Sequence, residues 1–214
     1  MRFLQWLSLA LIVLFMGCNV SVNKSVDVPD GSKTHHGYTS VNGSIRIGSD
    51  CDIRGTCRSV NGSIEVGSRS TVRKVQSVNG GIRVMEWAKI REAVEAVNGG
   101  VEMEQGTEAV DVKTVNGPVS LDSAAVTGGI ATYNGNITLD NNSVVKGDIR
   151  IKKRKHGQHH ADQNREETLV IEIMNRSSVE GDIVVYDSEQ KVDVILSGGG
   201  KVKGKIEKAN VVQR

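Results

Sequence analysis

Short runs in which apolar side chains alternate with polar ones recur along most of the chain. In Ile45-Arg46-Ile47 and in Ile64-Glu65-Val66, two apolar residues flank one charged residue. Such alternation is typical of a β-strand that buries one face. Apolar positions also recur every six residues, for example at Val60, Val66, Val72, Val78, Val84 and Ile90. Three six-residue faces make one turn of about 18 residues, which indicates a solenoid.

A longer repeat accompanies this rhythm. The motif is Ser/Thr/Ala-Val-Asn-Gly followed by alternating apolar residues, with Tyr replacing Val in its last copy. Its asparagines are Asn42, Asn61, Asn79, Asn98, Asn116 and Asn134, spaced by 18 or 19 residues. A looser form, Val-x-Gly-x-Ile, returns at 145–149, 179–183 and 202–206. Residues 39–214 are therefore predicted to form an all-β fold, a single-stranded parallel β-helix of triangular section with 18–19 residues per turn. Roughly nine or ten turns at about 4.8 Å each would give a rod on the order of 45 Å long.

The Asn-Gly pair is expected to turn the same corner in every repeat. Glycine adopts positive φ freely, and asparagine tolerates it. Stacked asparagines can also hydrogen-bond along the rod axis as a ladder. Asn-Gly between alternating apolar runs equally suits antiparallel hairpins. The constant repeat and its three apolar faces favour the solenoid.

One segment conflicts with this pattern. Residues 85–97, MEWAKIREAVEAV, are rich in helix formers and carry charges at helical spacing. Ile90 and Val94 nevertheless keep the six-residue register, so a further turn of the solenoid is favoured over a helix.

The amino terminus has the features of a targeting signal. Arg2 precedes a short apolar run, Leu7–Met16, that is too short to span a bilayer comfortably. Phe15-Met16-Gly17-Cys18 resembles a bacterial lipobox, although Phe15 stands where leucine is commonest. The resemblance implies that residues 1–17 are a lipoprotein signal peptide and that Cys18 carries the lipid. The alternative is an ordinary signal peptide that ends near a cysteine.

The residues around this cysteine suggest where the protein would be held. Asn19 is not the aspartate typical of inner-membrane retention, so we expect a lipid-anchored protein of the bacterial cell envelope, at the outer membrane. Residues 18–38 are mostly polar and are expected to form a tether and a cap, with Val26 and Val28 suggesting a short strand.

Composition excludes several classes of partner. The formal net charge is only +2, and the four aromatic residues beyond the leader are Tyr38, Trp87, Tyr133 and Tyr186. A bulk electrostatic contact with nucleic acid and a site built on stacked aromatic rings are both disfavoured. We expect no nucleic-acid partner.

Two cysteines follow in the predicted solenoid, Cys51 and Cys57. An exported protein meets an oxidising compartment, so a disulfide between them is one interpretation. Two small buried thiols at equivalent positions in the turn are the other. No further ligand accompanies them, so we expect no metal site there.

A basic segment interrupts the repeat at 152–167, between the strand-like runs 149–151 and 169–173. We expect it to be a loop inserted into the rod. Its run of cations, Lys152, Lys153, Arg154 and Lys155, suggests an anionic contact such as a phospholipid, lipopolysaccharide or wall polymer. The histidines behind it, His156, His159 and His160, suggest a transition-metal site as a second interpretation. A solvated loop without a ligand is the third.

The repeats from Ser40 to Val212 resemble two groups of proteins. The Val-x-Gly-x-Ile form resembles bactofilins, which are polymer-forming β-helical scaffolds, and this resemblance implies a right-handed helix. The six-residue rhythm equally fits the left-handed helix of hexapeptide acyltransferases, and we expect the right-handed sense. The Ser-Val-Asn-Gly form is similar to adhesin-like envelope repeat proteins of unknown function.

These features favour a non-enzymatic envelope rod with a structural or adhesin-like role and no cofactor. The alternative is a bactofilin-like scaffold that associates end to end. An acyltransferase or polysaccharide lyase is disfavoured, because the histidines lie only in the tether and the loop. The outward positions alternate in charge and then become neutral, which suits stacking: Arg46, Glu65, Arg83, Glu102, Ser120 and Thr138.

Overall fold

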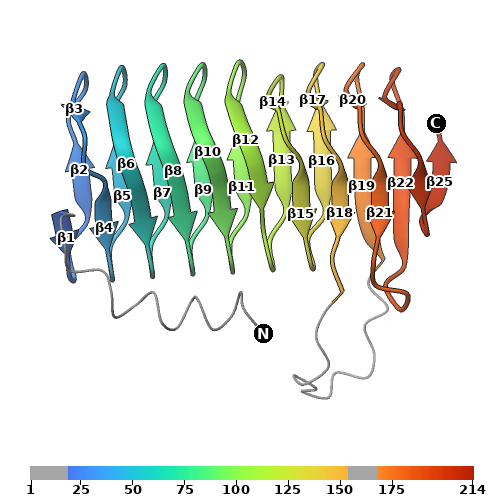
Figure 1. Ribbon diagram of the computed structural model, residues 1–214, viewed down its shortest axis with the longest axis horizontal. Coiled ribbons are helices and arrows are strands. Elements are labelled where there is room, and N and C mark those ends of the chain that lie inside the picture. The colour runs from blue at the N-terminus through green and yellow to red at the C-terminus, as the bar shows by residue number, and fades with distance from the viewer. Residues whose placement is uncertain (1–18, 154–167) are drawn as a thin grey trace.

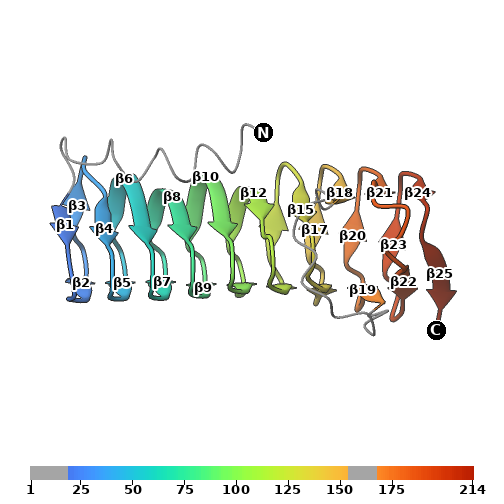
Figure 2. The ribbon, with the colours of Figure 1, turned by 90° about the horizontal axis from the view of Figure 1, so that it is seen from below.

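The computed structural model describes residues 19–153 and 168–214. Within these ranges the chain forms strands β1 to β25 and no helix. Every strand pair is parallel, and equivalent strands stack into a β-solenoid of about 9 turns (Figure 1). Strand β1 lies at one end of the rod and β25 at the other (Figures 1 and 2). The predicted all-β solenoid is confirmed, and the antiparallel hairpins are excluded for the described residues.

Each turn of the solenoid has three faces. Face 1 is a sheet of ten short strands that stack along the whole rod (Figure 2). Its strands are β2 (Val26–Val28), β5 (Ile45–Ile47), β7 (Ile64–Val66), β9 (Ile82–Val84), β11 (Val101–Met103), β13 (Val119–Asp122), β16 (Ile137–Asp140), β19 (Leu169–Ile173), β22 (Val192–Leu196) and β25 (Asn210–Gln213).

Faces 2 and 3 follow in chain order and belong to one hydrogen-bonded sheet. Four strands bend across both faces: β6 (Asp52–Ser59), β8 (Thr71–Ser77), β10 (Lys89–Ala96) and β12 (Glu108–Lys113). Face 2 also holds β3 (Lys33–Thr34), β14 (Ala125–Val126), β17 (Val144–Val145), β20 (Ser178–Val179) and β23 (Lys201–Val202). Face 3 holds β1 (Asn19–Ser21), β4 (Tyr38–Ser40), β15 (Ile130–Thr132), β18 (Ile149–Ile151), β21 (Ile183–Val185) and β24 (Ile206–Glu207).

The core consists of columns of like residues. The inward positions of face 1 are a typical column, in which each side chain packs on its equivalent in the next turn. It runs Ile45, Ile64, Ile82, Val101, Val119, Ile137 and Ile171, all at most 2% exposed. β-Branched side chains suit such stacking because they are stiff and pack well on a pleated surface. Burying each one contributes about 1.5–3 kcal/mol.

The segment that resembled a helix is a strand. Residues 89–96 form β10, which pairs with β8 and β12, and Ile90 and Val94 are buried in the register predicted for them. Tertiary burial of the apolar column outweighs the local helix propensity here.

The structure confirms the short strand expected at Val26 and Val28, but the residues around it in 19–38 belong to the solenoid rather than to a tether. Strands β1, β2 and β3 form the first turn of the solenoid and pair with β4, β5 and β6. Val26 and Val28 stack on Ile45 and Ile47, and Val28 is buried. The polar residues between these strands form the corners of the first turn. In the sequence they resemble a flexible segment, because a single turn contains few apolar residues.

The strands on either side of the expected insertion have the predicted bounds. Strand β18 ends at Ile151 on face 3, and β19 begins at Leu169 on face 1. Of the expected loop at 152–167, only Lys152 and Lys153 are among the described residues.

The glycines of the Asn-Gly pairs lie at the corner between face 3 and face 1. They are needed there for a different reason from the positive φ that the sequence suggested. Among the described glycines, positive φ occurs at Gly31, Gly106, Gly198 and Gly199, and none of these belongs to an Asn-Gly pair. The Asn-Gly glycines are instead stacked too closely for a side chain. A Cβ on Gly80 would lie 2.3 Å from the carbonyl oxygen of Gly62 in the preceding turn.

Most of the positive φ angles among the described residues lie at the next corner, between face 1 and face 2. There the left-handed residues are mostly not glycine, and they include Asp50, Arg69, Trp87, Ser123 and Asn141. Asp50 and Arg69 stack on each other in a two-bonded ion pair, at 2.8 and 2.7 Å. This arginine lowers the pKa of Asp50 through its hydrogen bonds.

Neighbouring glycines provide a matched test of the stacked corner. Gly80→Ala should destabilise the protein by about 1–3 kcal/mol, because its methyl group meets backbone that cannot move without opening the stack. Gly81→Ala is the control, since its Cβ would approach no atom closer than 3.5 Å. Thermal unfolding of both variants measures the difference. Equal losses in the two would contradict the close stacking of this corner.

Candidate functional site

Each position of the Ser-Val-Asn-Gly motif has a distinct place at the first corner. The serine points inward and is buried at Ser40, Ser59 and Ser77. Its hydroxyl donates to a carbonyl oxygen of the preceding turn, as from Ser59 to Gly43 at 2.9 Å. Since a buried hydroxyl needs a partner, the corner carbonyl satisfies it.

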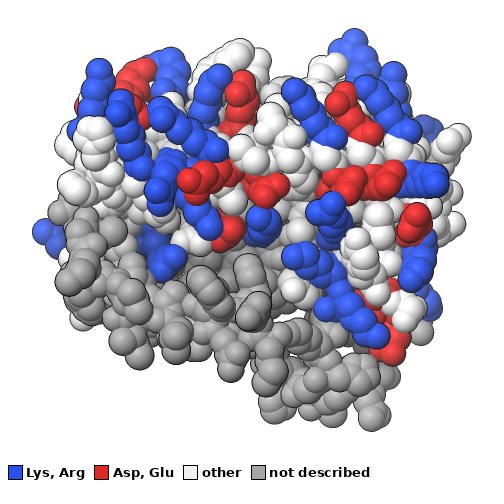
Figure 3. Space-filling model, viewed as in Figure 1, with Lys and Arg blue, Asp and Glu red and all other residues white. Residues whose placement is uncertain are grey.

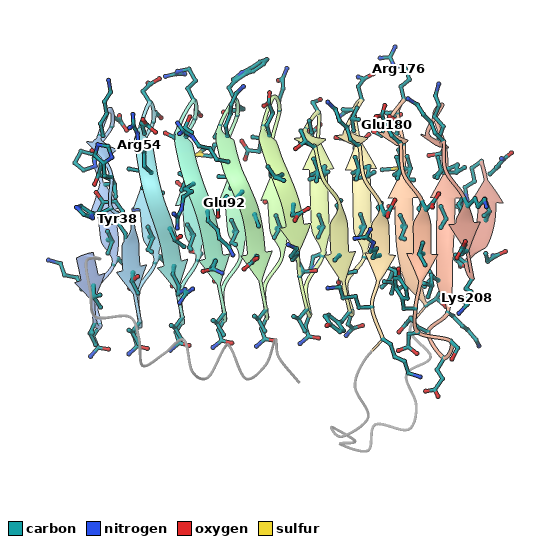
Figure 4. All side chains as sticks on the ribbon, in the orientation of Figure 1. Tyr38, Arg54, Glu92, Arg176, Glu180 and Lys208 are labelled. Atoms are coloured by element: carbon teal, nitrogen blue, oxygen red, sulfur yellow. The ribbon has the colours of Figure 1, made fainter. Side chains whose placement is uncertain are left out.

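The asparagines form the predicted ladder. Each Nδ2 donates to the Oδ1 of the asparagine one turn earlier, at 2.7–2.9 Å from Asn61 through Asn116. The same short side chain recurs at this corner in successive turns (Figure 4). Asn134 was expected to continue the ladder, but its side chain makes no hydrogen bond within the described residues.

The ladder also has a member that the sequence analysis missed. Asn42 donates to Asn23, which lies in the first turn and has a φ of 58°. Lys24 follows Asn23 in place of glycine, so the motif was hidden there. The 19-residue offset from Asn42 was the signal that could have revealed it.

The valine of the motif points outward, although the six-residue rhythm predicted that it would point into the core. The six-residue rhythm grouped Val60 and Val78 with core positions such as Val66 and Val72. The structure leaves Val60 and Val78 half-buried on the surface and places serine inside. We call the outward row the valine stripe: Val41, Val60, Val78, Val97 and Val115, one per turn.

The outward column of face 1 is stacked as predicted. Register pairs Arg46 with Glu65, Glu65 with Arg83, and Arg83 with Glu102, and the column continues to Ser120 and Thr138. Arg83 Nη2 lies 2.7 Å from Glu102 Oε2, and Arg46 Nε lies 3.8 Å from Glu65 Oε1. The column begins one turn earlier, where Arg46 also pairs with Asp27 at 3.1 Å.

A neighbouring carboxyl group shows how crowded these charges are. Burial, together with the nearby Glu86, raises the pKa of Glu104, and Arg83 opposes that rise. Burial is the largest cause of the shift, and the charged side chains of adjacent turns modify it. Acidic and basic side chains are interspersed over the visible face of the rod rather than gathered by sign (Figure 3).

The two cysteines are not joined. Cys51 and Cys57 are both buried, and no disulfide links them. They also do not occupy equivalent positions. Cys51 lies at the corner before face 2, aligned with Ser70, whereas Cys57 lies on face 3 opposite Val75. The structure therefore favours the interpretation of two buried thiols over the disulfide, but it does not place them at equivalent positions of the turn.

The basic run is described only in part. Lys152 is half-buried, and its Nζ lies 5.8 Å from the centre of the Tyr133 ring; Lys153 is exposed. Arg154, Lys155 and the histidines at 156, 159 and 160 lie outside the described residues.

In residues 19–153 and 168–214, no group of three or more His, Cys, Asp and Glu side chains is placed to hold a metal ion. The described chain contains no helix with the length and hydrophobicity needed to cross a membrane. No protein-family model matches this chain, and neither the curated proteins nor the solved structures include a significant match.

The charge column gives a test of the stacked register. Arg83→Glu would place three carboxylates in consecutive turns: the introduced one, Glu65 in the preceding turn and Glu102 in the following turn. The loss should be about 1–2 kcal/mol at low salt and should shrink at high salt, because the side chains are half-exposed and screened. Melting curves at two salt concentrations measure it.

Two further variants complete this test. Arg83→Gln removes the attraction without adding repulsion and should lose less. Adding Glu65→Arg and Glu102→Arg to Arg83→Glu should restore part of the stability. Absence of both salt dependence and rescue would mean that these residues are not stacked.

Proposed function

We propose that this protein is a non-enzymatic, lipid-anchored structural rod of the bacterial cell envelope, held at the outer membrane through Cys18. The observation that carries the proposal is the solenoid itself, whose first strand begins at Asn19, directly after that cysteine. Its outer surfaces are occupied by ladders and ion pairs that hold one turn to the next. Such an arrangement suits a load-bearing or adhesin-like role.

The position of β1 changes how the anchor would work. Because Asn19–Ser21 pair with β4, a lipid on Cys18 would be attached to the first turn with no flexible spacer. The rod would then be held against the membrane surface at one end. Lys152 and Lys153 lie several turns away from β1. There the basic run that they begin would contact an anionic envelope polymer or lipid headgroup.

A bactofilin-like scaffold is the second candidate, and the far end of the rod favours it. Val202, Ile206 and Val211 lie over buried Val179, Ile183 and Val194 but are covered by no further turn in the described chain. Val211 is 44% exposed. Open strand edges with apolar residues invite another chain, and the first turn of a second copy presents matching faces.

Replacement of Cys18 tests the anchor. Cys18→Ser should move the protein from the membrane fraction to the soluble fraction, because no thioether-linked lipid can form. Cys51→Ser is the matched control and should stay with the membrane, since the aligned position already holds Ser70. The proposal fails if Cys18→Ser still sediments with membranes after a salt wash.

The released protein also separates the two candidates. Electron microscopy of Cys18→Ser should show single rods of about nine turns. Filaments that shorten on Ile206→Lys, and persist on the mid-rod change Val110→Lys, would favour the scaffold instead.

A further inference from the structure

The valine stripe forms one side of a straight groove. Val60, Val78, Val97 and Val115 line it in consecutive turns, and it ends at Tyr133 and Lys152. The strand register continues the row into the next turns. Lys113 pairs with Ala131, which aligns Val115 with Tyr133. Thr132 pairs with Ile151, which aligns Tyr133 with Lys152. The groove is thus a row of apolar side chains with an aromatic ring and a cation at one end.

The opposite wall is polar but largely neutralised within itself. Arg58 Nε donates to Gln76 Oε1 at 3.1 Å, and the amide of Gln76 donates to Glu95. Glu95 is paired with Lys74 at 3.0 Å. Lys113 is likewise paired with Asp111 at 2.9 Å. Within the described residues, Lys152 has no carboxylate partner, and its ammonium group faces the Tyr133 ring.

Backbone pairing decides what kind of chain fits this groove. The strands beneath it are hydrogen-bonded to the turns on both sides, as β8 is to β6 and β10. An extended peptide would therefore find no free strand edge on which to add. A hydrocarbon chain needs only apolar contact, which the valines supply.

The groove also has the length of such a chain. Three steps of about 4.8 Å separate Val60 from Val115, or about 14 Å. One leaflet of a bilayer's hydrocarbon region is about 15 Å thick. We propose that the valine stripe binds a long-chain acyl group, with its anionic head at Lys152 and Tyr133. The occupant we assign is a separate anionic lipid, because an acyl chain bonded at Cys18 has no charged end to meet Lys152, and the site does not depend on that anchor.

Binding of palmitate to the whole chain carrying Cys18→Ser tests the site. Titration calorimetry below the micelle concentration should detect binding, and Val97→Lys should weaken it more than about tenfold, since a charge would then interrupt the apolar row. Val110→Lys is the control, an exposed valine outside the groove, and should change the affinity less than about twofold. No binding, or equal binding by these two variants, would overturn the proposal.

Lys152→Gln provides a second, gentler variant. It should weaken palmitate binding about tenfold, the range expected for losing one charge-assisted contact, and leave binding of the uncharged hexadecanol unchanged. Equal effects on both ligands would contradict the assigned head position. The lipidated wild-type protein should bind palmitate as the Cys18→Ser form does. Binding by the Cys18→Ser form alone would mean that the lipid on Cys18 fills the groove, and it would overturn a separate lipid as the occupant.

Discussion

Parallel pairing between successive turns places every residue about 4.8 Å from its equivalent in the next turn. A side chain is therefore tolerated only if it can stack on a copy of itself or on a complementary partner. Isoleucine and valine meet this constraint in the core by packing. Asparagine meets it by donating and accepting one amide hydrogen bond each, as from Asn79 to Asn61. Charged residues meet it by alternating in sign.

The same constraint fixes the character of the outer surface. Polar groups on the rod are used first to hold neighbouring turns together, as in the ion pair of Arg83 with Glu102. Among the described residues, the valine stripe, Lys152 at its end and the open strand edges of the last turn are not used in this way, and they are the surfaces for which we propose partners.

Periodicity was sufficient to predict the three-faced parallel solenoid, the Asn ladder and the charge column, because each depends only on which residues recur. Periodicity alone did not show which side chains point into the core and which point outward, or which atoms contact the preceding turn. Val60 lies on the repeat but points outward, since Ser59 fills the interior and hydrogen-bonds a corner carbonyl. The Asn-Gly glycines were explained by backbone freedom, yet contact with the preceding turn requires them. Asn19–Thr34 lacked a complete motif, so the first turn resembled a tether.

A designed cross-link between turns tests the in-register stack most directly. Ser44 and Ser63 are equivalent residues of adjacent turns, and their Oγ atoms lie 3.1 Å apart. With Cys18 replaced by serine, Ser44→Cys with Ser63→Cys should form a disulfide under mild oxidation and leave the melting temperature unchanged or higher. Ser44→Cys with Ser68→Cys, at the two ends of face 1, should form none. A disulfide in the second pair, or none in the first, would contradict the parallel solenoid.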